Sequence, residues 1–183
     1  MAILVVYESM FGNTKAVAEA IAAGLGTGDV TVCVAASAPR GDLSRFDLVV
    51  AGGPTHAWGL ARPTTRRAAP QYVARSHGAL TLEPEATGPG LLEWFADLGP
   101  QRGTAAAFDT RLKAPALVTG RGARRVVREL RRSGYTLLDV PRSFFVDRSN
   151  VLRPGELDRA RRWGEELAAR RARSALQTPG SPR

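Results

Sequence analysis

The sequence predicts one α/β domain on a doubly wound parallel sheet of five strands, in the order 2-1-3-4-5, with helices on both faces. Apolar, β-branched segments alternate along the chain with segments of helical periodicity, and this alternation is typical of parallel sheets with crossover helices. The 183 residues suffice for one domain with a substantial core, and no internal repeat marks a second domain. We expect the domain to cover residues 1–174 and a disordered tail to cover 175–183.

Five segments have the composition of strands: residues 2–7, 29–36, 47–52, 104–109 and 135–146. The first is apolar on both faces, as expected at the centre of a parallel sheet. The fourth is a weaker pattern because it is rich in alanine, and Pro141 interrupts the fifth.

Helical periodicity marks the segments between the strands. In residues 14–25, Val17, Ile21 and Leu25 recur every four positions and predict one buried stripe. Gly24, Gly26 and Gly28 are expected to end this helix. A second helix is expected at residues 120–133. The last helix is expected at 154–175, with an inward face of Leu157, Ala160, Gly164, Leu167 and Ala168.

The connection between the third and fourth strands, residues 53–103, is long and holds two helix-like pieces. We expect residues 89–98 to be the crossover helix. The piece at 64–76 is then part of an insertion, around 64–90, near the carboxyl ends of the strands. Such an insertion either shapes a substrate pocket or decorates the surface.

The net charge of +9 comes almost entirely from arginine, since Lys15 and Lys113 are the only lysines. One interpretation is a solvated arginine-rich surface, and the other is a docking face for an acidic partner. Six arginines between 121 and 132 spread around one helix and allow both interpretations. No nucleic-acid motif accompanies the charge, and aromatic residues do not alternate with the arginines, so we expect no nucleic-acid partner.

Targeting and metal-binding signals are absent from the sequence. No apolar run is long enough to span a membrane, and the chain starts in a strand-like run without a basic leader, so we expect a cytoplasmic protein. Cys33 is the single cysteine. It has no disulfide partner in the chain and no metal-ligand spacing around it, and we expect a buried structural thiol and no metal site.

The loop at residues 8–14, here called the phosphate loop, is the most informative segment. It joins an apolar strand to a helix, where free backbone N–H groups and the helix dipole favour an anion. A capped helix start is the alternative, but Gly12 adds nothing to a plain cap, whereas it lets a ligand approach the backbone. The loop contains no lysine and no Walker pattern, which favours a monophosphate such as flavin mononucleotide (FMN) over a triphosphate. The candidate residues are Ser9, Met10, Phe11, Gly12, Asn13 and Thr14.

Two further loops, at residues 53–63 and 109–119, are expected at the same edge of the sheet, next to the switch point between strands 1 and 3. With these loops placed, the chain resembles the flavodoxin-like family of FMN-binding proteins over residues 1–174. Ser9, Gly12 and Thr14 are similar to the hydroxyl-rich phosphate loop of that family. Phe11 departs from the pattern because a hydroxyl is usual there, and the loss of one phosphate hydrogen bond costs about 1 kcal/mol.

The resemblance implies roles for the other two loops. The second would pack against the isoalloxazine ring, and the third would reach the pyrimidine edge of the flavin. Trp58 either stacks on the flavin or is an ordinary half-buried aromatic. His56 is the candidate catalytic residue, as a proton donor, although it could instead bond the backbone or stack on the ring. The residues concerned are Pro54, Thr55, His56, Trp58, Gly59, Phe108, Asp109, Thr110 and Arg111.

The resemblance also implies FMN as the cofactor and a redox function. Small electron-carrier flavodoxins are typically acidic, whereas this chain is basic. At about 6 Å and an effective dielectric of about 20, the charge of Arg111 favours the anionic reduced flavin by roughly 3 kcal/mol. This corresponds to a shift on the order of 0.1 V toward easier reduction. We therefore expect an FMN-dependent oxidoreductase that acts on a quinone-like or other small acceptor. Whether the protein is an enzyme stays open at this point.

Two other functions remain open. One is a one-electron FMN carrier that docks on an acidic redox partner, and the other is an interaction module that holds no flavin. NAD(P)H, if it is the donor, would have to bind over the flavin, because the chain has no dinucleotide-binding fingerprint.

Overall fold

The computed structural model describes residues 2–26, 28–56, 59–114, 120 and 122–177. Its sheet has the order β2-β1-β3-β5-β6, and every pair along this path is parallel. This confirms the predicted doubly wound α/β fold, while the number and order of the strands differ slightly from the prediction. The strands are β1 (Ala2–Tyr7), β2 (Val30–Val34), β3 (Phe46–His56), β4 (Gly59–Leu60), β5 (Thr104–Leu112), β6 (Thr136–Leu137) and β7 (Arg142–Val146).

The sheet has seven strands instead of five because the expected fifth strand is split and a short hairpin strand is added. β6 pairs with the start of β5 and β7 with its end. The chain between Leu137 and Arg142 is longer than the opposing chain between Ala105 and Phe108, so the excess leaves the ladder. Pro141 lies in this break and has no N–H for the ladder. β4 pairs antiparallel with the end of β3.

β3 and β5 extend beyond the predicted bounds, and Gly53 and Pro54 pair with Asp109 and Thr110. The third predicted loop therefore begins later than expected, since residues 109–112 belong to β5. Proline is tolerated at position 54 because its missing N–H would face a side of β3 that has no neighbouring strand at this point. The carbonyl of Gly52 accepts the N–H of Glu8 on the β1 side, so Pro54, two residues on, faces that same side after β1 has ended.

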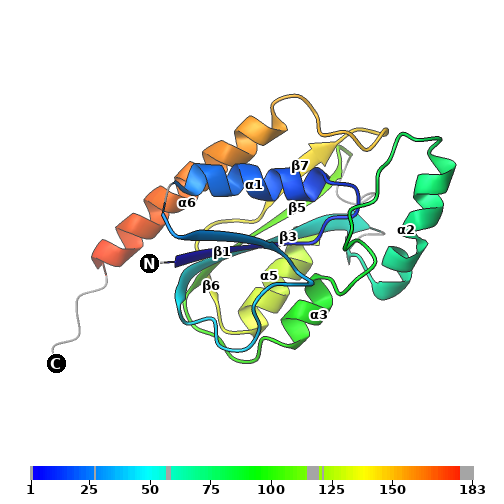
Figure 1. Cartoon of the computed structure of the whole chain (residues 1–183). Helices are drawn as coiled ribbons and strands as arrows, with labels where there is room; N and C mark the ends of the chain where they lie inside the picture. Colours follow the sequence, from blue (N-terminus) through cyan, green and yellow to red (C-terminus); the bar gives the residue numbers. More distant parts are fainter. Residues whose placement is uncertain (1, 27, 57–58, 115–119, 121, 178–183) are drawn as a thin grey trace.

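Helices cover both faces of the sheet. Figure 1 shows α1 (Asn13–Leu25) and α6 (Glu156–Gln177) on one face, and α3 (Leu91–Ala96) and α5 (Gly122–Arg132) on the other. The remaining described helix, α2 (Pro63–Arg75), stands beyond the carboxyl ends of the strands. Of the two pieces in the long connection, α3 is the one that packs on the sheet, through the fully buried Leu91 and Trp94.

The inward face of α6 differs in part from the prediction. Ala160 and Leu167 are buried as expected, but Leu157 is 44% exposed, and Trp163 is buried instead. Helical geometry explains this, because Ala160, Trp163 and Leu167 define the centre of the stripe and Leu157 lies at its edge, in the first turn. The helix continues to Gln177, beyond the expected start of the tail, and residues 178–183 lie outside the described part. None of the described helices is long and apolar enough to cross a membrane.

Candidate functional site

The phosphate loop connects β1 to α1 and has the geometry of an anion cradle. Gly12 precedes the helix with φ +85°, a left-handed conformation that favours glycine, and its N–H donates to Ser9 Oγ at 3.2 Å. The backbone N–H groups of Asn13, Thr14 and Lys15 begin the helix and have no hydrogen-bond acceptor among the described residues. These amides are the groups that an anion would bind.

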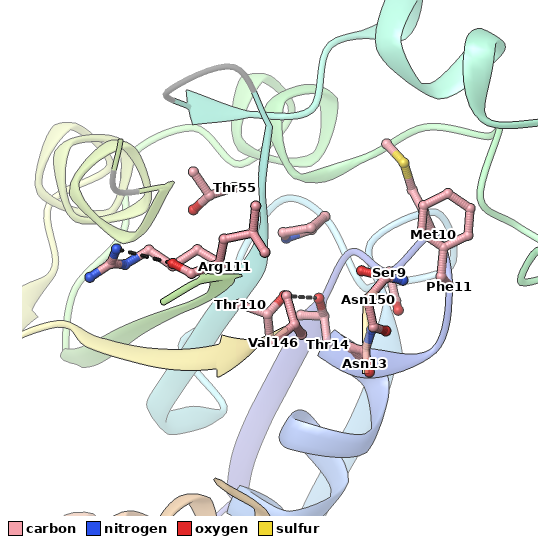
Figure 2. A pocket seen from close by; sticks show the side chains of 12 residues that line it. Ser9, Met10, Phe11, Asn13, Thr14, Thr55, Thr110, Arg111, Val146 and Asn150 are labelled. Atoms are coloured by element: carbon pink, nitrogen blue, oxygen red, sulfur yellow. Dashed lines mark hydrogen bonds between the residues drawn. The ribbon is translucent and has the colours of Figure 1, made fainter. Parts of the chain in front are cut away.

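Two polar side chains of the loop are already engaged. Thr14 Oγ1 lies 2.7 Å from Thr110 Oγ1 of β5, and Asn13 Nδ2 donates to the carbonyl of Asn150 at 2.7 Å. Figure 2 shows the contact between the threonines at the base of the pocket. These bonds fix the loop to the end of β5 and to the turn after β7. The donors that remain for a phosphate are therefore mainly backbone amides.

A cavity of about 190 Å³ opens beside this loop, at the carboxyl ends of β1, β3 and β5. Nine of the predicted residues line it: Ser9, Met10, Phe11, Asn13, Thr14, Pro54, Thr55, Thr110 and Arg111. Three further residues line the cavity and were not among the predicted site residues: Leu112, which lies in the predicted third loop, Val146 and Asn150. Val146 and Asn150 follow the rule that placed the other loops, because they lie at the carboxyl end of the fifth strand of the predicted sheet.

Two residues of the predicted third loop lie outside the cavity. Phe108 is a fully buried core residue of β5, with its ring edge-on to Phe144 and Trp163. Asp109 is also fully buried, and its Oδ2 accepts hydrogen bonds from the Thr55 hydroxyl and the Ala123 N–H, both at 2.9 Å. We correct their predicted roles accordingly: Phe108 packs the core, and Asp109 caps α5.

The second loop is only partly described. Gly59 begins β4, which pairs with the end of β3 at His56, and Gly59 does not line the cavity. The side chain of His56 and the whole of Trp58 lie outside the described part of the chain. The proton-transfer role of His56 and the stacking role of Trp58 therefore stay predictions.

Arg111 lies at the far side of the cavity from the phosphate loop. Its Nη1 donates to the carbonyl of Ala114 at 2.9 Å, and its guanidinium lies 4.9 Å from the centre of the Phe145 ring. Figure 2 shows the guanidinium pointing away from Ser9 and Asn13. The positive charge thus belongs to the half of the pocket opposite the anion cradle.

The family and structure comparisons agree with this geometry. A family model described as a flavodoxin domain matches residues 4–81. An archaeal flavodoxin structure is 22% identical, with a TM-score of 0.61 over 94% of this chain and 99% of its own. Flavodoxin 1 from Bacillus cereus is 15% identical, with a TM-score of 0.63 over 92% and 98%. The chain has the flavodoxin-like fold. The search of curated proteins gave no match.

Rubredoxin oxygen:oxidoreductase from Desulfovibrio gigas also has this fold, at 15% identity and a TM-score of 0.56, over 97% of this chain and 37% of its own. The resemblance to flavodoxins implies FMN as a cofactor, and the site can be tested for its fit to that group. The cavity fits such a group, because its neutral amide cradle suits one phosphate and the strand ends provide a wall for a ring.

The unusual Phe11 of this flavodoxin-like protein has a packing role. Its half-buried ring contacts an apolar cluster of Met10, Ala61, Ala69 and Ala86, which joins the phosphate loop to the insertion. Figure 2 shows the ring beside Met10, directed away from Thr14. The hydroxyl expected at this position is therefore replaced by a contact that holds the insertion against the loop.

A buried ion network next to the phosphate loop was not predicted. Arg66 of α2, 2% exposed, lies 3.5 Å from Glu8 Oε1 and 2.6 Å from Glu93 Oε1. Burial raises the pKa of Glu8, although a hydrogen bond from the Leu91 N–H and the charge of Arg66 oppose this. For Glu93, burial also acts to raise the pKa, but hydrogen bonds from Arg66 and backbone N–H groups outweigh it and lower the pKa. The network fixes α2 and α3 to the end of β1.

Proposed function

We propose that this flavodoxin-like protein binds FMN at the carboxyl edge of its sheet and acts as an oxidoreductase on a quinone-like or other small acceptor. The observation that carries the proposal is the anion cradle, in which the free amides of Asn13, Thr14 and Lys15 begin α1 beside a cavity lined by strand ends. A phosphate at this place would anchor the cofactor, and the cavity beyond it would hold the ring.

Each part of the cavity has a distinct task in this proposal. The amides of α1 hold the phosphate, while Pro54, Thr55 and Thr110 provide the wall against which the ring is oriented. FMN, when bound, supplies the redox chemistry. Arg111 places a positive charge in the opposite half of the cavity. Such a charge favours the anionic reduced state of the flavin over the neutral oxidised state. This electrostatic bias supports an oxidoreductase over a carrier of low potential.

Gly12→Ala tests the cradle directly. An alanine at this position would have to adopt a backbone φ of +85°, which costs about 1–2 kcal/mol. Relief of this strain would displace the backbone amides of the anion cradle. We expect the Kd for FMN, measured by quenching of flavin fluorescence, to rise about 10-fold. Gly41→Ala is the matched control, since Gly41 has φ +75° and open space around it, away from the cavity. Absence of quenching in the unmodified protein would overturn the proposal and favour the flavin-free module.

Turnover separates the oxidoreductase from the carrier. Steady oxidation of NADH or NADPH by the FMN-loaded protein in the presence of a soluble quinone is expected for the oxidoreductase. An FMN-loaded protein that passes electrons only to another protein would contradict it.

The surface of α5 favours the carrier as the second candidate. Arg124, Arg128 and Arg131 are exposed and form no ion pair with any described residue, whereas Arg125 and Arg132 both pair with Glu129. The first turn of α5 also reaches the site, because the Gly122 N–H donates to the Thr55 hydroxyl. An acidic redox protein bound to α5 would therefore lie near the flavin.

The carrier hypothesis predicts docking that depends on these arginines. Replacing Arg124, Arg128 and Arg131 with glutamine should slow electron transfer to an acidic ferredoxin at low salt by about 10-fold or more, and salt should remove the difference. The control replaces three exposed arginines elsewhere, Arg153, Arg162 and Arg173, which leaves the net charge equal. Equal rates in the two triple variants would contradict docking on α5.

A further inference from the structure

A short piece of the insertion lies directly on the phosphate loop. This covering segment, residues 82–86, follows α2 in the chain. The N–H of Glu83 donates to the carbonyl of Met10 at 2.8 Å, and Leu82 and Ala86 contact the apolar cluster that contains Met10 and Phe11. The position of the covering segment relative to the loop is therefore fixed by both a backbone bond and packing.

The covering segment brings a carboxylate to the anion cradle. Glu83 Oε2 lies 3.3 Å from Lys15 Nζ. Glu83 Oε1 lies 3.3 Å from the place that a Cβ on Gly12 would occupy, so the carboxylate almost touches the loop backbone. The hydrogen bond and the negative charge of Glu83 raise the pKa of Lys15.

Lys15 is the one cation among the loop and first-turn residues, Ser9 to Ala16. It is the third residue of α1, and helical side chains lean toward the N-terminus of their helix, which here is the cradle. A bound phosphate would attract its ammonium, but Glu83 already pairs with it. Glu83 also repels a dianion at short range, since little protein separates the carboxylate from the loop.

We propose that Glu83 and Lys15 form a charge pair that sets the discrimination between phosphorylated and unphosphorylated flavins. Lys15 strengthens binding of the phosphate, and Glu83 limits it by neutralising Lys15 and by its own negative charge. The inference rests on the proposed FMN site and assigns to the insertion a role in cofactor selection. The charge pair should affect the Kd for FMN and leave the Kd for riboflavin unchanged, because riboflavin lacks the phosphate.

The test compares dissociation constants of FMN and riboflavin by fluorescence quenching, at low and high salt. Glu83→Gln should lower the Kd for FMN by about 3- to 10-fold at low salt and change that for riboflavin by less than about 2-fold. Lys15→Gln should raise the Kd for FMN by a similar factor. Both effects should shrink at about 0.5 M NaCl, because exposed charges are screened. Glu85→Gln is the matched control, with the same loss of charge at an exposed position of the same segment.

The outcomes separate this inference from the proposed function. An unchanged FMN Kd in Glu83→Gln, or equal weakening of FMN and riboflavin, would overturn the charge-pair role and leave a purely structural segment. An equal effect of Glu85→Gln would also overturn it, because general charge would then explain the result. If the unmodified protein and all variants bind no FMN, the proposed function fails and the inference fails with it.

Discussion

Arg66→Met is expected to lower the free energy of unfolding by about 3–5 kcal/mol, because it leaves two carboxylates without their common partner. Glu8 is 4% exposed, and Arg66 contacts both Glu8 and Glu93. Methionine fills a similar volume, so the loss reports mainly on the missing charge and not on a cavity. Urea unfolding followed by circular dichroism measures the change.

The pH dependence gives this prediction a second readout. The folded-state pKa of Glu8 is raised above its usual value of 4.5. Ionisation of Glu8 therefore carries a free-energy penalty in the folded state, and the stability that its neutral form provides is lost as pH rises above 4.5. Without Arg66 this penalty grows, because a charge that held the pKa down is gone. Glu93 has a lowered pKa, so its stabilisation is present above 4.5 and is lost as pH falls, and Arg66→Met removes part of it. The deficit of Arg66→Met should therefore be smaller at about pH 5 than at about pH 7.

Arg67→Met is the control for this experiment. Arg67 neighbours Arg66 on α2, is exposed and forms no ion pair with a described residue, so its loss should change stability by less than about 0.5 kcal/mol. Adding Glu8→Gln to Arg66→Met should recover part of the deficit, because a neutral amide tolerates burial better than an unpaired carboxylate. Equal deficits in the two arginine variants would contradict a structural role for the network.

The sequence was sufficient for the fold because local patterns determine its parts. The apolar run at residues 2–7 and the stripe of Val17 and Ile21 each indicate one element, and the alternation of such elements leaves few topologies. Strand ends were harder to predict. Gly53-Pro54 is typical of a turn, yet it continues β3, because the side of the ladder that would need the missing N–H has no neighbouring strand there.

The part of the candidate site that lies at the carboxyl ends of the parallel strands could be predicted from the sequence. The part that depends on contacts between residues far apart in the sequence could not. The loop at residues 8–14 and Thr110 lie at carboxyl ends of strands, and the fold places them together. The partnership of Arg66 with Glu8 joins residues 58 positions apart, and no local pattern reports such a contact. The same holds for Glu83 with Lys15, which are 68 positions apart.

Gly24→Ala and Gly164→Ala are each expected to destabilise the protein by about 2–4 kcal/mol, although alanine favours a helix over glycine by about 1 kcal/mol. The sequence suggested that Gly24 ends a helix, but the structure places it inside α1, against α6. A Cβ on Gly24 would overlap the carbonyl oxygen of Arg161, and one on Gly164 would overlap that of Ile21. Both obstacles are backbone atoms of helices, so only separation of the helices can relieve the overlap.

Gly28→Ala separates this effect from a general sensitivity of glycines. Gly28 has nothing within 4 Å of its would-be Cβ and has no positive φ, so alanine should change stability by less than about 0.5 kcal/mol. Thermal and urea unfolding of the three variants provide the comparison. Because α1 carries the phosphate loop at its N-terminus, separation of α1 from α6 should also weaken FMN binding in Gly24→Ala and leave it unchanged in Gly28→Ala. A stable Gly24→Ala protein would show that the two helices can move apart at little cost, contrary to the close packing at Gly24 and Gly164.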